Sequence, residues 1–228
     1  MGVEETIGVT ETAPPVPVQR GEQLLDHAVR YTEERHWDVF AGTWLESADG
    51  REVCSCGAAD CAAPGAHPAV KDWAAQATGS AVQVRRIWAK HPQASILMPT
   101  GRTFDALDVP DSAGFLALAR LERMQRTVGP VVLSPDHRML FFVLPGGGAK
   151  AADLVRKLGW SPASIDLGAR GEGEYVAAPP TRFGGRGAAQ WARRPTPANR
   201  WLPDTEELID ALAYACGREA AAARARKG

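Results

Sequence analysis

Apolar positions along the 228-residue chain recur at helical spacing in some segments and run together in short blocks in others. Leu24, Leu25, Ala28 and Val29 lie on one helical face, because residues three or four positions apart are neighbours on a helix surface. The same spacing predicts a series of helices over residues 22–36, 80–90, 111–126, 150–159 and 204–216.

Polar residues mark where several of these helices begin. Ser80 and Gln83 have the spacing of a capping box, in which each side chain satisfies a free backbone N–H. Asp111 or Ser112 can cap the third helix, and Asp204 can cap the last.

Short apolar runs between the helices predict strands. Residues 94–98 and 104–109 are separated by a Pro-Thr-Gly turn, so we expect buried, neighbouring strands there. Further strands are expected at residues 37–45, 131–134, 139–144, 164–167 and 174–178. A mixture of this kind indicates an α/β or α+β fold.

Composition divides the chain into one main domain with a tail at each end. Residues 1–20 hold prolines and acidic residues without apolar periodicity, so we expect a disordered tail. The domain is expected over residues 21–217, with a Cys-, Gly- and Pro-rich loop inserted at about 47–68, and a basic tail over 218–228.

Charge and hydropathy exclude some classes of protein. A net charge of −1 and a pI near 6.5 give no overall attraction to nucleic acid, so any such contact must be local. The sequence shows no signal peptide and no apolar run of bilayer length, which predicts a cytoplasmic protein with no membrane partner.

Three cysteines and a histidine lie close together in the inserted loop. Cys54, Cys56, Cys61 and His67 have the spacing C-x-C-x4-C-x5-H. Three thiolates and one imidazole make a closed tetrahedral site that favours structural zinc over a catalytic metal. The alternative is a set of surface thiols beside a turn histidine.

Several motifs then follow one another in a fixed order. They are Cys54 to His67-Pro68, Arg86-Ile87-Trp88, His91 to Ile96, Leu107-Asp108-Val109 and Tyr175 to Pro180. Their succession over residues 22–201 resembles the N-terminal domain of the actinobacterial bifunctional DNA primase/polymerases. The resemblance implies a primase-polymerase-type mixed sheet with flanking helices and a small zinc loop.

The resemblance also implies a reaction and its reactants. Members of that family add nucleotides from nucleoside triphosphates to DNA, with Mg²⁺ or Mn²⁺, on a single strand or a primer-template. The first family acid falls on Asp108 and the third on Asp166, whereas Pro110 replaces the second. Asp111 can replace that missing ligand only if the strand has already turned.

The family's histidine strand is altered in a similar way. Met139 stands where the resemblance places the histidine, and Arg138 precedes it. His137 is a candidate substitute, since it points to the same face if the segment is extended. The resemblance therefore places His137 or Arg138 at the triphosphate.

Arginines and aromatic residues are interleaved near the end of the domain. Arginine for phosphates and aromatic rings for bases is the composition of a single-strand groove. The candidate nucleic-acid-binding residues are Arg182, Arg186, Arg193, Arg194 and Trp191. Solvated loop arginines around core tryptophans are the alternative.

Three functions stay open on the sequence. The first is metal-dependent, DNA-templated nucleotidyl transfer by a primase/polymerase. The second is a pseudoenzyme of the same family that binds nucleic acid or nucleotide. The third is a protein-interaction module, for example with a replication protein, that keeps the fold and the zinc loop for stability.

Overall fold

A computed structural model describes residues 17–48 and 50–226 of the chain. Its helices are α1 (Pro17–Arg35), α2 (Trp73–Gln76), α3 (Ala81–Lys90), α4 (Asp111–Arg123), α5 (Gly147–Lys157) and α6 (Thr205–Ala225). Its strands are β1 (Phe40–Ala41), β2 (Leu45–Ala48), β3 (Arg51–Cys54), β4 (Ile96–Pro99), β5 (Asp105–Pro110), β6 (Val131–Ser134), β7 (Arg138–Val143), β8 (Gly168–Arg170), β9 (Tyr175–Ala177) and β10 (Gln190–Arg193). Short 3₁₀ turns are η1 (Pro162–Ser164), η2 (Gly184–Arg186) and η3 (Pro197–Asn199).

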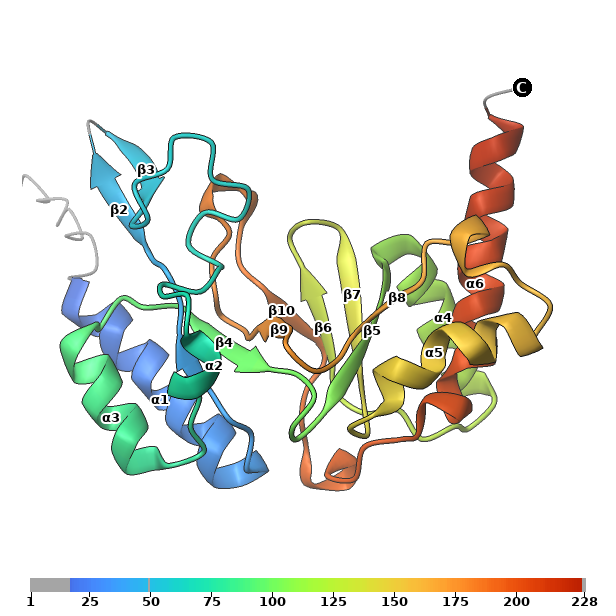
Figure 1. Cartoon of the computed structure of the whole chain (residues 1–228), viewed down its shortest axis with the longest axis horizontal. Helices are drawn as coiled ribbons and strands as arrows, with labels where there is room; N and C mark the ends of the chain where they lie inside the picture. The colour runs from blue at the N-terminus through green and yellow to red at the C-terminus, as the bar shows by residue number, and fades with distance from the viewer. Residues whose placement is uncertain (1–16, 49, 227–228) are drawn as a thin grey trace, which may run out of the picture.

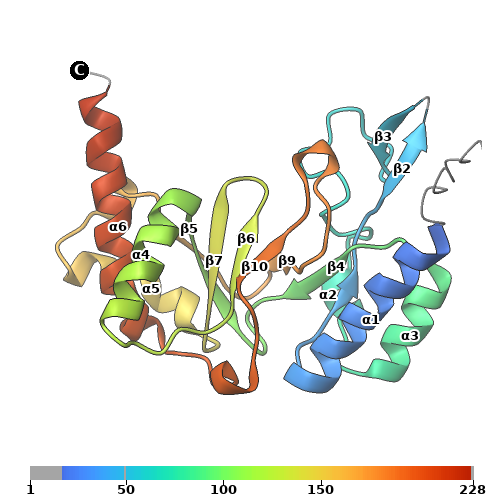
Figure 2. The same ribbon diagram turned by 180° about the vertical axis from the view of Figure 1, so that it is seen from behind.

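The larger sheet is antiparallel, in the order β10-β6-β7-β5-β8. Helices α4, α5 and α6 cover one of its faces (Figures 1 and 2). Leu107 and Val109 of β5 point into the core beneath these helices, together with Met139 and Phe141 of β7. The alternation along a strand sends Asp108 to the opposite face.

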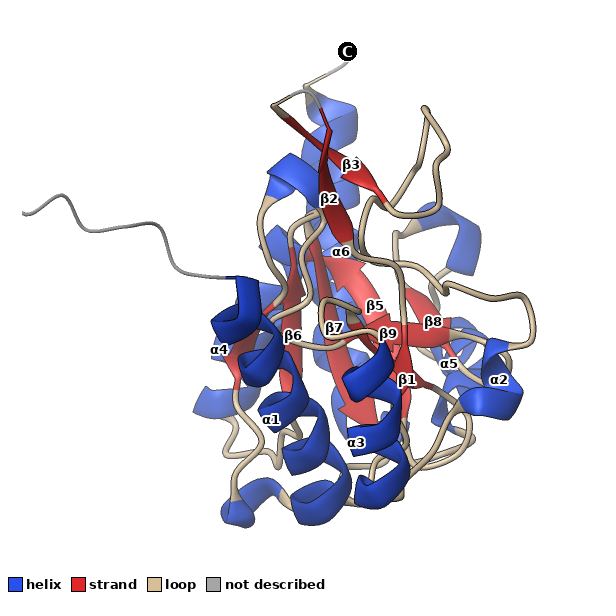
Figure 3. Ribbon diagram, turned by 90° about the vertical axis from the view of Figure 1, so that its left-hand side faces the viewer, coloured by secondary structure: helices blue, strands red, loops and turns tan. Residues whose placement is uncertain are grey.

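That opposite face meets the N-terminal part of the chain. A second sheet, in the order β1-β4-β9, joins a core that includes Trp37, Leu97, Leu140 and Phe142. Helices α1 and α3 lie side by side in this part (Figure 3). The β2–β3 hairpin and the Cys/His loop extend from it (Figure 1), so the loop and Asp108 belong to the same side of the large sheet.

The mixed α+β fold is confirmed, and most of the expected elements are present. Strands 131–134 and 139–144 correspond to β6 and β7, and Asp204 caps α6 in a capping box with Glu207. None of the helices in the described residues combines the length and the apolar composition that a bilayer-spanning segment needs.

Other expectations were wrong in detail. β4 and β5 belong to different sheets, because the chain turns away at residues 100–104 instead of forming a hairpin. Ser80 precedes α3 without a side-chain capping bond. Residues 162–164 form η1, and the following strand begins only at Gly168.

The two expected tails fall partly outside the described residues. Residues 1–16 are not described, and α1 begins at Pro17. The last helix does not end near Cys216: α6 continues to Ala225, so most of residues 218–228 are helical. Alanines and arginines dominate this last stretch, and both are strong helix formers.

Candidate functional site

Asp108 lies in the middle of the large sheet with both carboxylate oxygens bound to arginines. Its side chain is 12% exposed. Oδ1 accepts a hydrogen bond from Nε of Arg138 at 2.6 Å, and Oδ2 accepts one from Nε of Arg170 at 2.9 Å. Nη2 of Arg170 is also 2.8 Å from Oδ2. These are charge-assisted bonds of the strong class.

Arg138 connects the two expected acids. Its Nη1 donates to Oδ2 of Asp166 at 2.7 Å, and its Nη2 donates to the backbone oxygen of Asp108 at 3.2 Å. Burial lowers the pKa of Arg138, but its hydrogen bonds to Asp166 and Asp108 outweigh this effect and raise that pKa. The structure therefore brings Asp108, Asp166 and Arg138 together in one cluster.

Sequence reasoning missed Arg170, the fourth member of this cluster. It stands at the end of β8, opposite Ala106 of β5, and its Nη1 also donates to the backbone oxygen of Tyr175 at 3.1 Å. Its only sequence signal is its place on a strand just after Asp166.

His137 lies away from the cluster. It occupies the β6–β7 turn with a positive φ of 62°, so the segment is not extended there and the condition for its expected role is not met. Its ring is 87% exposed, and Nδ1 is 3.0 Å from Oδ2 of Asp111. Asp111 thus pairs with His137 at the start of α4 and does not join Asp108.

Met139 faces the helices. It is paired with Val109, and its side chain is fully buried. A Cβ added to Gly114 of α4 would lie 2.4 Å from its sulfur, so the two residues are packed in direct contact. A histidine at position 139 would point away from Asp108 in this register.

The cluster as arranged does not fit a pair of divalent cations. Two aspartates and two arginines sum to zero charge, whereas catalytic magnesium is held by free carboxylate oxygens. Pro110, opposite Arg138, brings no side-chain ligand atom.

Asp105 of β5 is buried, at 1% exposure. Its carboxylate accepts hydrogen bonds from the backbone N–H of Gly101 at 2.9 Å and of Gly148 at 2.8 Å. Asp105 therefore fixes the turn before β5 against the first turn of α5. A negative charge is favourable at that helix N-terminus.

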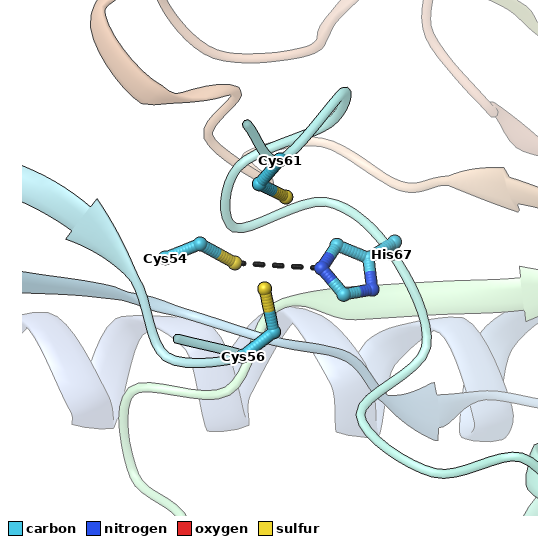
Figure 4. A group of neighbouring side chains, drawn as sticks. All are labelled: Cys54, Cys56, Cys61 and His67. Atoms are coloured by element: carbon cyan, nitrogen blue, oxygen red, sulfur yellow. Dashed lines mark hydrogen bonds between the residues drawn. The ribbon is translucent and has the colours of Figure 1, made fainter. Parts of the chain in front are cut away.

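The four Cys/His side chains converge as expected (Figure 4). One ligand atom of each of Cys54, Cys56, Cys61 and His67 lies within 4.8 Å of all the others. Sγ of Cys54 is 3.4 Å from Nε2 of His67, whose Nδ1 lies 3.0 Å from the backbone oxygen of Pro68. This donor set fits a structural metal ion.

The thiols of Cys54 and Cys61 differ in pKa. Burial raises the pKa of Cys54, but hydrogen bonds from the backbone N–H of Cys56 and of Gly65 outweigh it and lower that pKa to about 6. Burial, followed by the neighbouring thiols, raises the pKa of Cys61 to about 11. Cys54 is therefore more readily ionised for metal binding than Cys61.

Three of the four candidate DNA-binding arginines contact the protein itself. Arg182 forms a two-bond ion pair with Glu52 of β3, at 2.6 and 2.9 Å. Arg186 donates to the backbone oxygen of Ala62 at 2.7 Å, and Arg193 pairs with Glu122 at 3.2 Å. Arg182 and Arg186 thus hold the hairpin and the Cys/His loop.

Trp191 belongs to the core. Its Nε1 donates to the hydroxyl of Tyr31 at 3.2 Å, and its ring packs edge-on against Phe142. The solvated-arginine and core-tryptophan alternative therefore describes most of this segment.

Arg194 is exposed and lies near α1. Arg200 and Trp201, which were not among the binding residues predicted from the sequence, are exposed as well. Burial lowers the pKa of Arg35, Glu34 raises it and the charge of Arg200 lowers it further. The pKa of His27 is lowered by burial, with smaller contributions that include the charge of Arg194. Trp201, which follows Arg200 in the chain, is 82% exposed.

Comparison with known proteins identifies the family. The sequence pattern of the bifunctional DNA primase/polymerase N-terminal family, Prim-Pol, matches residues 28–201. No curated protein and no solved structure matches the chain. The matched region contains the Cys/His loop, both sheets and the Asp108 cluster. The chain therefore belongs to the bifunctional DNA primase/polymerase N-terminal family.

Proposed function

We propose that this chain is a Prim-Pol domain that binds nucleic acid or nucleotide without catalysing nucleotidyl transfer. Family membership supports a function of the DNA primase/polymerase type. The observation that carries the non-catalytic proposal is that Arg138 and Arg170 occupy both oxygens of Asp108.

Opening this cluster to a metal ion costs free energy. Two-metal phosphoryl transfer needs carboxylates that hold cations about 4 Å apart. A cation at Asp108 would have to displace guanidinium groups whose side chains are only 23% and 31% exposed. Leaving such charges without their partners costs several kcal/mol, on the order of 3 to 5 for a buried pair.

One observation favours active transfer as a second candidate. Asp108 and Asp166 contact the same guanidinium, so the two retained acids lie close together. If Arg138 turned to a triphosphate, both carboxylates would face one shared space. Arg138 suits that role, because its planar fork matches phosphate oxygens.

The nucleic-acid surface that we propose consists of Arg194, Arg200 and Trp201. The arginines supply positive charge beside α1, and the exposed indole offers a face on which a base can stack. Arg182, Arg186 and Arg193 are already in intramolecular contacts, so we assign them to the scaffold.

The metal that we propose for the Cys/His cluster is zinc. Three thiolates with one imidazole suit Zn²⁺ better than Mg²⁺ or Mn²⁺, which prefer oxygen ligands. The closed donor set makes its role structural.

Primer extension and primer synthesis on single-stranded DNA, with Mg²⁺ or Mn²⁺, test the catalytic part. We expect no product from zinc-loaded protein beyond that of Asp108→Asn. Product that forms with the wild type and disappears in Asp108→Asn would overturn the proposal in favour of active transfer.

A salt titration of single-stranded DNA binding tests the surface. We expect Arg194→Ala and Arg200→Ala each to weaken binding and to reduce the salt slope by about 1. Arg123→Ala, an exposed arginine on α4, is the matched control and should leave the slope unchanged. If neither DNA nor nucleotide binds or raises the melting temperature, the protein-interaction function takes precedence.

A further inference from the structure

A small cavity of about 100 Å³ lies between the Cys/His loop and the large sheet. Ala63 and Ala66 line it from the loop. Ser134, Asp136 and Arg170 line it from the sheet and from the β6–β7 turn. Because Arg170 is also a partner of Asp108, the cavity adjoins the Asp108 cluster.

Residues 61–67 form the roof of this cavity. This segment contains both alanines, and a metal-ligating residue stands at each of its ends, Cys61 and His67. Ala66 is 3% exposed and belongs to the core that includes Phe183, another lining residue. A metal ion bound by Cys61 and His67 therefore fixes both ends of the roof.

Little apolar burial holds the roof in place. Within residues 55–67, only Gly65 and Ala66 are buried. Arg186 donates to the backbone oxygen of Ala62 at 2.7 Å, but one hydrogen bond gives little net stabilisation, because water competes for both partners. Segments with few buried apolar contacts open at low free energy. Metal ligation is then the main interaction that keeps the roof closed.

Asp136 makes closure of the roof unfavourable. Its Oδ1 is shielded from solvent and has no hydrogen-bond partner among the described residues. A carboxylate oxygen that loses its hydration without gaining a partner raises the free energy of the closed state. Opening the roof would return this oxygen to water.

Tyr175, also in the lining, connects the roof with the Asp108 cluster. Nη1 of Arg170 donates to its backbone oxygen at 3.1 Å. Burial raises the pKa of Tyr175, the positive charge of Arg170 lowers it, and Cys61 raises it. The phenol is thus within electrostatic range of both a metal ligand and a partner of Asp108.

We propose that the metal ion of the Cys/His cluster holds this roof closed beside the Asp108 cluster, and that release of the metal opens it. With the roof open, Ser134, Asp136 and Arg170 become accessible while the rest of the domain stays folded. This inference rests on the metal that we propose for the Cys/His cluster, and it does not depend on whether the Asp108 cluster is catalytic.

Cysteine labelling of the full chain tests the opening. Ser134→Cys places a thiol at a lining position that is only 6% exposed. We expect iodoacetamide to modify this thiol at least about 10-fold faster after chelation than in the zinc-loaded protein, with the site located by peptide mapping. Ser47→Cys, at an exposed position of β2, is the control and should react at the same rate in both states. Cys216, 2% exposed in the other core, should stay unmodified in both.

Zinc affinity, measured by competition with a chromophoric chelator, tests the cost of closure. Asp136→Asn removes the charge of the shielded carboxylate, so we expect it to bind zinc about 3- to 10-fold more tightly than the wild type. Direct electrostatics predicts the opposite sign, since a negative charge near a cation favours its binding. Asp60→Asn neutralises an exposed acid of the loop outside the cavity lining, and should leave zinc affinity unchanged or weaken it.

A thiol at position 134 that stays protected after chelation, or that reacts equally in both states, would overturn the proposal. Modification of Cys216 after chelation would also overturn it, because the whole domain would then open rather than the roof. If Ser134→Cys does not fold, as judged by its melting curve, the zinc affinity of Asp136→Asn decides, and an affinity equal to or below that of the wild type counts against the proposal. A wild type that binds no zinc would end the metal assignment together with this inference, whereas the salt titration decides the nucleic-acid surface separately.

Discussion

Arg138 reaches diagonally across the β5–β7 pair to Asp108, with its Nε 2.6 Å from Oδ1. The register places Arg138 directly opposite Pro110 and Asp108 opposite Leu140. Diagonal neighbours on one face of a sheet are within reach of a long side chain. An arginine opposite proline is thus free to turn toward the one acid that remains on this strand face.

Asp108→Asn should destabilise the protein by about 2 to 3 kcal/mol, because it leaves two partly buried guanidinium groups without their anion. Asp166→Asn is the matched control. Asp166 is 65% exposed, so its loss should cost less than about 1 kcal/mol. Urea denaturation of both variants and the wild type measures the difference.

Stabilisation by Asp108→Asn would contradict this prediction. A set of carboxylates held ready for a metal repels itself, so Asp108→Asn would stabilise the metal-free protein. An increase in its unfolding free energy would show that Asp108 is not satisfied by arginine, and would remove the main support for the non-catalytic proposal.

Met139→His, which restores the residue type that the resemblance expects, should destabilise the protein by about 2 kcal/mol or more without creating activity. The new ring would be buried against Gly114 of α4, where its nitrogens would lose their hydration. His137→Ala removes an exposed histidine and should change stability by less than about 0.5 kcal/mol. Nucleotide incorporation by Met139→His would contradict the pairing of Met139 with Val109.

The sequence predicted those elements whose apolar residues face a core. β5 and β7 were found because their apolar runs are buried on both faces, and α4 was found from its helical period. The β2–β3 hairpin was missed because residues such as Glu46, Ser47 and Glu52 are exposed and polar, without apolar alternation.

The two candidate sites also differ in how far the sequence predicts them. The Cys/His cluster is local, so spacing alone was enough to bring its four residues together. The partners of Asp108 depend on the register of three strands, and Arg170 enters the cluster only through the pairing of β8 with β5. Spacing along the chain contains no information about such pairing.

Removal of the metal should loosen the hairpin and the Cys/His loop. We expect one equivalent of zinc per chain, and a melting temperature lower by about 5 °C or more after chelation. Elemental analysis and thermal unfolding measure both. Cys56→Ser should reproduce the loss, and a chain that contains no metal as purified and does not respond to added zinc would contradict the assignment.

Thiol counting separates the cluster from the remaining cysteine. Burial raises the pKa of Cys216 to about 12, with smaller contributions from Asp166 and Glu219, and the residue is 2% exposed. After chelation we expect Cys54, Cys56 and Cys61 to react with a thiol reagent in the folded protein, and Cys216 only in denaturant. Reaction of all four thiols at one rate would show that the domain unfolds when the metal leaves.

Asp204 links pH to the stability of α6. Its carboxylate accepts from the backbone N–H of Glu206 at 3.1 Å. This bond is the largest of the causes that lower the pKa of Asp204 below 3.8, and Lys150 adds to it. A lowered pKa in the folded state means that the cap stabilises the protein fully above about pH 3.8. That stabilisation is lost as the pH falls through the folded value.

Asp204→Ala should therefore cost about 1 kcal/mol near neutral pH, the usual effect of losing an N-cap. The difference from the wild type should shrink below about pH 3.8, because the wild-type carboxylate is then protonated as well. Urea denaturation across this range measures it, with Asp204→Asn as the control that keeps a cap but not the charge. A difference that stayed constant down to pH 2 would mean that the charge of Asp204 contributes nothing and that the cap acts through its neutral hydrogen bond alone.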